Sequence, residues 1–354
     1  MERFPRILID LEKIEKNTRA IVDMASKRGI EITAVTKASC GDPNVAFAML
    51  KGGATSLGES RVRNIKRLRA QGIGSPIMLL RTPMLSEARS VVQHADISLN
   101  SEVRVLKALS REAASGGKEH KVVPMVEMGD LREGIRRDAV PHFLEVVQNL
   151  EGLSLHGLGM NLACFGGVVP TAEKVREFEE LVMSMEDRIG VELKMVSGGN
   201  SANIPHLIEQ EKAGRTNNLR VGEGILLGLE TVNRTPIPGT FQDAFVLEAE
   251  LIERKRKPSV PDGTVSQNAF GETPEFEDKG EMIRGIAAVG RQDAILEDLS
   301  PMREDVEVLG GSSDHLLLGM GDSSPDVGDV LRFIPAYGAL VHLFTSQYVS
   351  KVYV

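Results

Sequence analysis

The sequence contains no tryptophan, few aromatic residues and only two cysteines. Aromatic residues make up 4% of the 354 residues, which disfavours a stacking surface for nucleic-acid bases. Cys40 and Cys164 are too few for a disulfide framework or for a structural zinc site. The net charge of −8 disfavours nucleic acid and anionic membranes as partners and is compatible with cationic small molecules.

Long apolar runs and targeting segments are also missing. No run approaches the roughly 20 apolar residues of a membrane-spanning helix. The first five residues, Met1-Glu2-Arg3-Phe4-Pro5, lack the apolar stretch of a signal peptide. We therefore expect a cytoplasmic protein. With 42% hydrophobic and 26% charged residues, a chain of this length indicates two globular domains.

Strand-like and helix-like segments alternate through the first two thirds of the chain. A short arm over 7–10 and a helix over 11–26 come first. The predicted strands that follow are the run from Glu31 to Lys37 and segments 55–57, 77–80, 96–98, 122–127, 153–158, 193–196 and 218–221. The predicted helices lie near 43–51, 59–69, 85–93, 101–114, 142–149, 171–188 and 204–212. Eight strand-then-helix units have the rhythm of a (β/α)8 barrel. A doubly wound open sheet is the alternative, but no G-x-G-x-x-G fingerprint supports it.

The pattern changes beyond about residue 229. A turn-rich linker over 231–239 precedes alternating segments separated by Gly, Pro, Asp and Ser. Their predicted strands are 244–251, 306–309, 315–318, 330–333, 340–344 and 348–354. We expect an N-terminal arm over 1–10, a barrel over 11–230 and a mostly β domain over 231–354. Whether the last strand pairs with the arm is left open.

Lys37 lies at the end of the first predicted barrel strand, just before the turn Gly41-Asp42-Pro43. In α/β proteins chemistry gathers at the carboxyl ends of the strands. A bare ammonium is costly to bury, so such a lysine is either ion-paired or deprotonated and used as a nucleophile or base. A lysine that simply reaches water is the alternative.

Other strand ends add polar residues and glycine turns. Arg132 and Asn161 follow middle strands, and the segments 197–203 and 219–225 follow the last two. Small residues in those two segments expose backbone N–H groups beside a helix start, which favours an anion. One lysine, one anion site and inward arginines indicate a lysine-linked phosphorylated cofactor, with pyridoxal 5'-phosphate as the candidate.

In this order along the full length, the motifs resemble those of the alanine-racemase-type (fold type III) pyridoxal-phosphate enzymes, most closely the ornithine racemase branch. The motifs that carry the resemblance are 35–43, Gly58-Glu59-Ser60-Arg61, 129–135, 197–201, Arg220-Val221-Gly222-Glu223, 311–315 and Ala336-Tyr337-Gly338.

The resemblance implies a role for each matched residue. The implied cofactor-binding set is Lys37, Arg132, Asn161, Asn200, Ser201, Arg220, Gly222, Glu223 and Tyr337. Lys37 would be the Schiff-base lysine and one of two racemisation bases, and Arg220 would face the pyridine nitrogen. Asn200, Ser201 and the Gly222 region would hold the phosphate, which Tyr337 would touch from the β domain. Asn161 would lie near the ring. Arg132 would lie near the phenolic oxygen or the substrate carboxylate.

Two positions depart from the better-known alanine racemases. Phe270 stands where the resemblance places their second base, a tyrosine, and Met125 stands where many relatives carry a carbamylated lysine. The base for the second face is therefore open. His315 and Asp314 are the first candidates, then Tyr337. Cys40 and Cys164 are more remote candidates.

The resemblance implies a racemase of a basic amino acid, ornithine or next lysine, with Asp314 and Glu223 available for a distal ammonium. It also implies a homodimer with shared active sites and no metal. The alternatives are a racemase of other specificity such as alanine or serine, a fold-related amino-acid decarboxylase, and a non-enzymatic pyridoxal-phosphate carrier.

Overall fold

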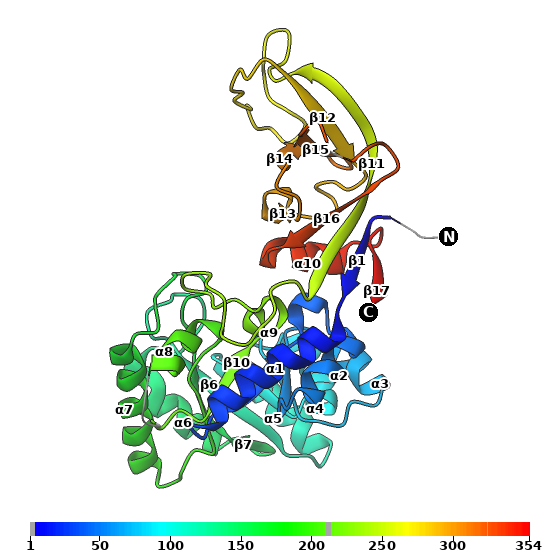
Figure 1. Cartoon of the computed structure of the whole chain (residues 1–354). Helices are drawn as coiled ribbons and strands as arrows, with labels where there is room; N and C mark the ends of the chain where they lie inside the picture. Colours follow the sequence, from blue (N-terminus) through cyan, green and yellow to red (C-terminus); the bar gives the residue numbers. More distant parts are fainter. Residues whose placement is uncertain (1–3, 210–213, 324) are drawn as a thin grey trace. The chain divides into compact units, whose positions relative to one another are not determined.

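The computed structural model describes residues 4–209, 214–323 and 325–354 (Figure 1). The chain divides into two compact units. One unit is Leu11–Gln242, and the other combines Met1–Asp10 with Asp243–Val354.

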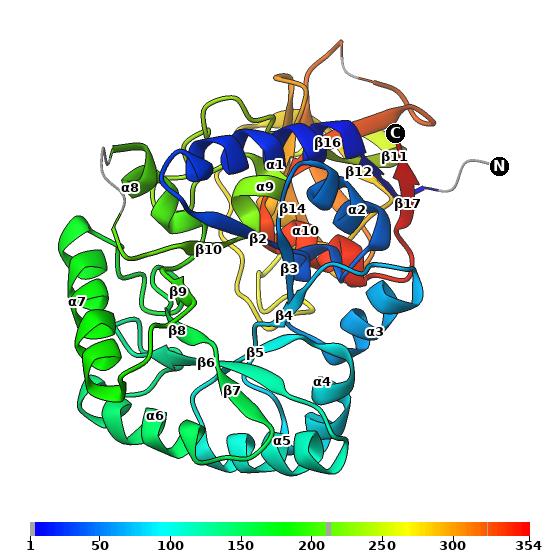
Figure 2. The ribbon, with the colours of Figure 1, turned by 90° about the horizontal axis from the view of Figure 1, so that it is seen from below.

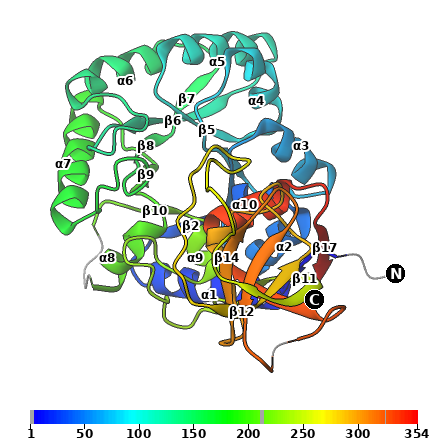
Figure 3. The same cartoon turned by 90° about the horizontal axis from the view of Figure 1, so that it is seen from above.

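Among the described residues, eight parallel strands close a barrel in the first unit, with helices around it (Figures 2 and 3). In order around the ring they are β2 (Glu31–Val35), β3 (Ser56–Glu59), β4 (Ile77–Leu79), β5 (Ile97–Asn100), β6 (His120–Val126), β8 (Gly157–Met160), β9 (Met195–Ser197) and β10 (Asn218–Val221), which pairs with β2 again. The predicted barrel fold is confirmed.

The helices follow the strands in the expected alternation. They are α1 (Leu11–Ser26), α2 (Pro43–Lys51), α3 (Val62–Ala70), α4 (Ala88–His94), α5 (Val103–Ser115), α6 (Val140–Gln148), α7 (Ala172–Ile189), α8 (Ile204–Glu209) and α9 (Glu223–Leu227). Residues 210–212 of the helix predicted over 204–212 lie outside the described residues. The strand predicted over 153–158 is divided at His156 into β7 (Leu153–Leu155) and β8, both of which pair with β6.

Local sequence explains where the helix after Lys37 begins. The Asp42 carboxylate accepts hydrogen bonds from the backbone N–H groups of Asn44 and Val45, at 3.0 and 3.1 Å. Pro43 occupies the first helical turn, where its missing N–H costs nothing. This cap fixes the start of α2 directly after the turn that carries Lys37.

Two apolar clusters cover the two faces of the strands. The larger cluster joins strand residues such as Val122 and Leu158 to helix residues such as Phe143 and Phe178, so it lies between the strands and α5–α7. The smaller cluster contains strand residues alone, namely Met78, Ile97, Leu99, Val123 and Met125. Because side chains alternate across a strand, the smaller cluster lies inside the barrel.

The second unit is mainly an antiparallel sheet. Its strands are β11 (Phe245–Pro258), β12 (Glu281–Ala287), β13 (Leu299–Pro301), β14 (Val306–Gly311), β15 (Leu316–Met320), β16 (Val330–Pro335), β17 (Ser350–Tyr353) and the N-terminal β1 (Arg6–Ile9). Strand β1 pairs antiparallel with β11 and parallel with β17. The N-terminal arm is thus part of the β unit.

The prediction of a strand over 340–344 is wrong, because α10 (Tyr337–Thr345) spans these residues. Its buried residues Ala339, Leu340, Leu343 and Phe344 recur at helical spacing. A short apolar run does not by itself distinguish a buried strand from a helix. Strands β12 and β13 were not among the predicted strands; the start of β12 alternates poorly between buried and exposed positions, and β13 is only three residues long.

The barrel unit extends to Gln242, past the border expected at residue 230. The Asn17 side chain on α1 accepts from the Phe241 N–H at 2.6 Å and donates to the Phe241 carbonyl at 2.8 Å. The Ile237 N–H donates to the Gly228 carbonyl at 2.9 Å. These bonds tie the linker to the barrel. In the described part of the chain, no helix is both long enough and apolar enough to cross a membrane.

Candidate active site at the carboxyl end of the barrel

Lys37 directly follows Thr36 at the end of β2, in a single turn of 3-10 helix. The residue is exposed, yet surrounding protein removes enough water to lower the pKa of its ammonium below the usual 10.5. The Cys164 sulfur and the Glu59 carboxyl group act to raise this pKa, and the cations of Arg132 and Arg220 lower it. The effects that lower the pKa dominate, so at a given pH a larger fraction of Lys37 is the neutral amine than in an ordinary lysine.

Arg220 lies on β10 and is only 5% exposed. Its guanidinium donates to neutral acceptors: the Ser197 hydroxyl, the Ser197 carbonyl at 3.3 Å and the Met160 carbonyl at 2.7 Å. Among the described residues, no carboxylate lies within ion-pair distance of it. Burial, reinforced by the Arg132 charge and opposed by Glu133, lowers the pKa of Arg220 to about 10. The side chain is still a cation at neutral pH.

Two glycine turns lie beside this arginine and are joined to each other. The Asn200 side chain accepts from the Ala202 N–H at 2.8 Å, and the Asn203 side chain accepts from the Asn200 N–H at 3.1 Å. The Ser201 hydroxyl accepts from the Gly224 N–H at 3.1 Å, which connects the first turn to the start of α9. Both turns are therefore held by side chains rather than left as free loops.

Glycine is required in these turns for steric reasons. Gly199 has φ +144°, and a Cβ there would come within 2.0 Å of the Asn203 side-chain oxygen. A Cβ at Gly222 would come within 3.1 Å of the Val35 Cβ. A side chain at either position would press on these neighbouring protein atoms and disturb the turn.

Asn161 follows β8 and connects the first turn to Arg220. Its side-chain oxygen accepts from the Asn200 amide at 3.1 Å and from Arg220 at 3.4 Å. Its own Nδ2 is buried and forms no hydrogen bond with any described residue. An unsatisfied buried donor costs free energy, so this N–H₂ group is suited to a ligand acceptor.

Arg132 lies in the loop after β6 and is held by side chains on both sides. Glu133 accepts two hydrogen bonds from its guanidinium, and the Cys164 sulfur lies 2.9 Å from its Nη1. Burial disfavours the charge of Arg132, but these neighbours raise its pKa overall. Asp130 is 1% exposed and accepts from the backbone N–H groups of Cys164 and Phe165. This carboxylate anchors the loop that presents the thiol.

The side chain of Glu223 forms an ion pair with Arg234. The side chain of Glu223 is 10% exposed. Its backbone begins α9 directly after Gly222. The contribution of Glu223 to an anion site would therefore come from its backbone, since its side chain is engaged elsewhere.

Three of the predicted site residues belong to the β unit. His315 and Asp314 form a hydrogen-bonded pair, with Nδ1 and Oδ1 2.7 Å apart and both side chains exposed. Tyr337 begins α10. Phe270 is 44% exposed, and the Arg291 guanidinium lies 4.8 Å from its ring centre.

Sequence reasoning missed several residues at this end of the barrel. Glu59 is fully buried, accepts from the Thr36 hydroxyl at 2.9 Å and has its pKa raised by desolvation. Ser197 and Asn218 also belong to the site, because the Ser197 hydroxyl accepts from Arg220 and donates to Asn218. Their signal was a polar residue at an inward position of an otherwise apolar strand. Glu133 and the partner role of Cys164 had no sequence signal, because the contact joins two different loops.

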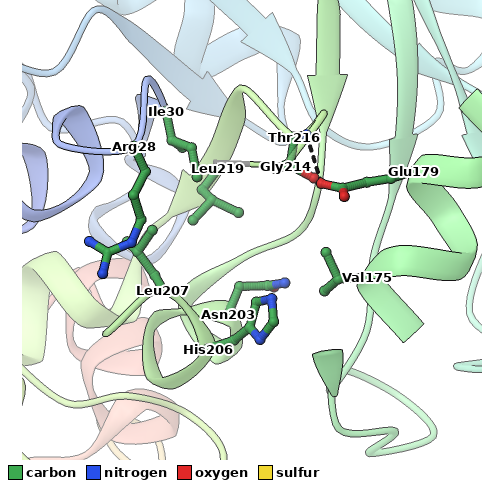
Figure 4. Close-up of a pocket in the computed structure, with 10 residues that line it drawn as sticks. All are labelled: Arg28, Ile30, Val175, Glu179, Asn203, His206, Leu207, Gly214, Thr216 and Leu219. Atoms are coloured by element: carbon green, nitrogen blue, oxygen red, sulfur yellow. Dashed lines mark hydrogen bonds between the residues drawn. The ribbon is translucent and has the colours of Figure 1, made fainter. Parts of the chain in front are cut away.

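A separate pocket lies between α7, α8 and the segments that precede β2 and β10 (Figure 4). It contains about 390 Å³ of space that is partly open to solvent. Arg28, Glu179, His206 and Thr216 are among its lining residues, and Glu179 accepts from the Thr216 N–H at 2.8 Å. Asn203, from the predicted anion segment 197–203, is also a lining residue, whereas Lys37, Arg132, Asn161 and Arg220 are not.

Comparisons with known proteins agree with this arrangement. The family model described as alanine racemase, N-terminal domain, matches residues 9–229. Over 351 residues the chain is 40% identical to a lysine racemase of Thermotoga maritima, covering 99% of this chain and 98% of that protein. Over 352 residues it is 38% identical to an ornithine racemase of Acetoanaerobium sticklandii, covering 98% and 99%.

Solved structures show the same fold at lower sequence identity. An alanine racemase from Corynebacterium glutamicum is 17% identical, with a TM-score of 0.76 and full coverage of both chains. A D-threonine aldolase from Filomicrobium marinum is 16% identical, with a TM-score of 0.75, and the match covers 96% of this chain and 89% of the aldolase. Because racemase and aldolase chemistry share this fold, the fold alone does not select the reaction.

Proposed function

The chain belongs to the alanine racemase N-terminal domain family, and from this premise we propose that it is a pyridoxal-phosphate-dependent racemase of a basic amino acid, with ornithine as the leading substrate and lysine next. The family resemblance identified from the motifs is confirmed. One observation carries the proposal: Lys37, whose pKa is lowered, lies at the same end of the barrel as the buried Arg220. Among the described residues, this arginine has no carboxylate partner. The two relatives named above supply the substrate class.

The residues present fit the cofactor. The unpaired Nδ2 of Asn161 offers a donor, Arg220 offers a cation, and Gly199 and Gly222 carry no side chain beside the backbone N–H groups of the two turns. Asn200, Ser201, Gly222 and the backbone of Glu223 would hold the phosphate, with Tyr337 contributing from the β unit. Arg132 and Asn161 would lie beside the ring, and Lys37 would carry the covalent link.

Each side chain then has a defined task. When bound, the cofactor delocalises the negative charge left on the substrate after its α-proton is removed. The neutral Nζ of Lys37 takes or returns that proton on one face, which its lowered pKa favours. The cationic Arg220 keeps a proton off the ring nitrogen and so limits side reactions. Arg132 is held by Glu133 where it can orient an anionic group.

For the opposite face we propose the His315 and Asp314 pair as proton carrier. Asp314 holds His315 at 2.7 Å and would orient its imidazole. For the distal ammonium of the substrate, Asp314 and Glu223 are the two acidic candidates, and each is already paired, with His315 and with Arg234 respectively. A homodimer with shared active sites and a cytoplasmic location complete the proposal and follow from the resemblance and the sequence.

The decisive experiment follows α-proton loss and chirality with each L- and D-amino acid in D₂O. We expect ornithine or lysine to exchange fastest and both enantiomers to form. Lys37→Ala should abolish both the exchange and the visible cofactor absorbance. Lys51→Ala, an exposed lysine on α2 paired with Glu15 at 2.7 Å, is the control and should keep both. If the holoenzyme exchanges no amino acid, the proposal is wrong.

The second base has its own test. His315→Gln and Asp314→Asn should slow exchange from one enantiomer more than from the other, because each face has its own base. His342→Gln, an exposed histidine on α10, is the control within the same unit. Equal slowing of both enantiomers would exclude the pair as the base.

A further inference from the structure

A continuous chain of side-chain hydrogen bonds runs from Arg220 along the inner wall of the barrel. Arg220 donates to the Ser197 hydroxyl, which donates to the Asn218 side-chain oxygen at 2.5 Å. The Asn218 Nδ2 donates to the Thr33 hydroxyl at 2.9 Å. The Thr33 and Ser56 hydroxyls lie 2.8 Å apart.

The first member of this chain fixes the direction of its bonds as far as Thr33. A guanidinium has donors only, so the Ser197 oxygen must accept from it and is left with one proton to donate. That proton goes to Asn218, which orients the amide and places Nδ2 against Thr33. Thr33 accepts there, and in its bond to Ser56 either hydroxyl can be the donor. Hydrogen bonds that point the same way polarise one another.

Strand pairing explains why these residues meet. Ser197 pairs with Asn218 between β9 and β10, Arg220 pairs with Thr33 between β10 and β2, and Thr33 pairs with Ser56 between β2 and β3. Asn218 and Arg220 are two residues apart on one strand, so both point inward. All five residues are 9% exposed or less.

Resting on the proposed function, we propose that Ser197, Asn218, Thr33 and Ser56 form a hydrogen-bond relay that positions Arg220 and leaves its positive charge uncompensated toward the cofactor ring. Asn218, Thr33 and Ser56 do not bond to Arg220 directly. They are positioning residues that act through Ser197. A carboxylate in the relay would neutralise the charge that the arginine presents, and the neutral members avoid this.

Asn218→Asp tests the charge of the relay with minimal change in shape. Hydroxyls of Ser197 and Thr33 both have a proton to donate, so an aspartate can be satisfied at this position. It would also place a negative charge one hydrogen-bonded residue away from Arg220. The ring nitrogen should then hold a proton more readily than in the unaltered protein.

The first measurement needs no cofactor. In the cofactor-free protein, NMR of the Arg220 guanidinium N–H groups, assigned with Arg220→Lys, reports how fast they exchange with water. Thr33→Val and Asn218→Ala should speed this exchange about tenfold, the factor for losing roughly 1.4 kcal/mol of hydrogen bonding. Thr33→Ser keeps the hydroxyl and should restore slow exchange.

Ser98→Ala is the matched control for this measurement. Ser98 is equally buried and bonded, to His120 at 2.8 Å and to Asn100 at 2.9 Å, but it has no link to Arg220. Its substitution should leave the Arg220 signals unchanged. Equal exchange in Thr33→Val and Ser98→Ala would overturn the relay.

The second measurement uses holoenzyme with cofactor labelled with ¹⁵N in the ring. Asn218→Asp should move the ¹⁵N signal toward that of a protonated ring, and Thr33→Ser should leave it in place. An Asn218→Asp signal identical to that of the unaltered protein across neutral pH would overturn the charge argument. Failure of the protein to bind the cofactor at all would instead contradict the proposed function, and the first measurement would still test the relay.

Discussion

The inner wall of the barrel has a polar half and an apolar half. Strands β9, β10, β2 and β3 contribute Ser197, Asn218, Arg220, Thr33 and Ser56, linked by hydrogen bonds. Strands β4, β5 and β6 contribute the cluster of Met78, Ile97, Leu99, Val123 and Met125. The polar half gives up hydrophobic burial to hold a cation, and the apolar half supplies packing. Substitutions in the two halves should therefore affect different properties.

The apolar half should control stability. Leu99→Ala removes a side chain that is 2% exposed and leaves a cavity inside the barrel. We expect a loss of about 2–5 kcal/mol in the free energy of unfolding, measured with urea. Exchange activity per folded molecule should stay normal. A large fall in that activity without loss of stability would show that the two halves are not separate in function.

The polar half should control chemistry. Arg220→Met should lower the rate of α-proton exchange by about 10²–10³-fold, because a preorganised donor beside the reacting group is lost. Stability should change little or rise, since an uncompensated buried charge is replaced by a side chain that packs. Arg104→Met, an exposed residue on α5, is the control. An unaltered exchange rate in Arg220→Met would contradict the division.

The loss of folding stability in acid should come from His120, which lies on β6. His120 is 2% exposed, and burial, opposed weakly by Asp96, lowers its pKa to about 4. The unfolded chain binds this proton near pH 6.5, so stability is lost as the pH falls from there toward 4. By pH 5 the loss is about 2 kcal/mol.

The His120→Gln variant isolates this contribution, because glutamine can still bond to Ser98 but does not titrate. Urea unfolding at pH 7 and pH 5 should show a smaller drop for the variant, with other groups contributing equally to both proteins. The same drop in both would mean that His120 is not the acid-sensitive group.

The smallest effect is expected at the loop after β8. Asp130→Asn weakens the bonds that hold the N–H groups of Cys164 and Phe165. Alkylation of Cys164, followed by mass spectrometry, should become severalfold faster, as expected for losing about 1 kcal/mol of hydrogen bonding. Cys40 in the same molecule is the internal control. Unchanged Cys164 reactivity would show that Asp130 does not restrain the loop.

The barrel could be predicted from sequence because its strands and helices alternate regularly and each is bounded by turn residues. Lys37 and the two glycine turns were recognisable because each follows a strand, and Arg220 because it lies in the motif that leads into the second turn. The relay was not, since Asn218 and Thr33 are far apart in sequence and meet only through strand register. Helix α10 was mistaken for a strand because four of the five residues from Leu340 to Phe344 are apolar, and so short an apolar run satisfies both periods.

Strand β1 carries a consequence for biosynthesis. Its two neighbours in the sheet are β11 and β17, and both come after the whole barrel unit in the sequence. A ribosome releases residues 6–9 first and their partner at Ser350–Tyr353 last. This edge of the β unit therefore cannot close until translation is nearly over, while the barrel has all its strands much earlier. A large tag fused ahead of residue 6 should therefore disturb the β unit, which is completed last, more than the barrel unit.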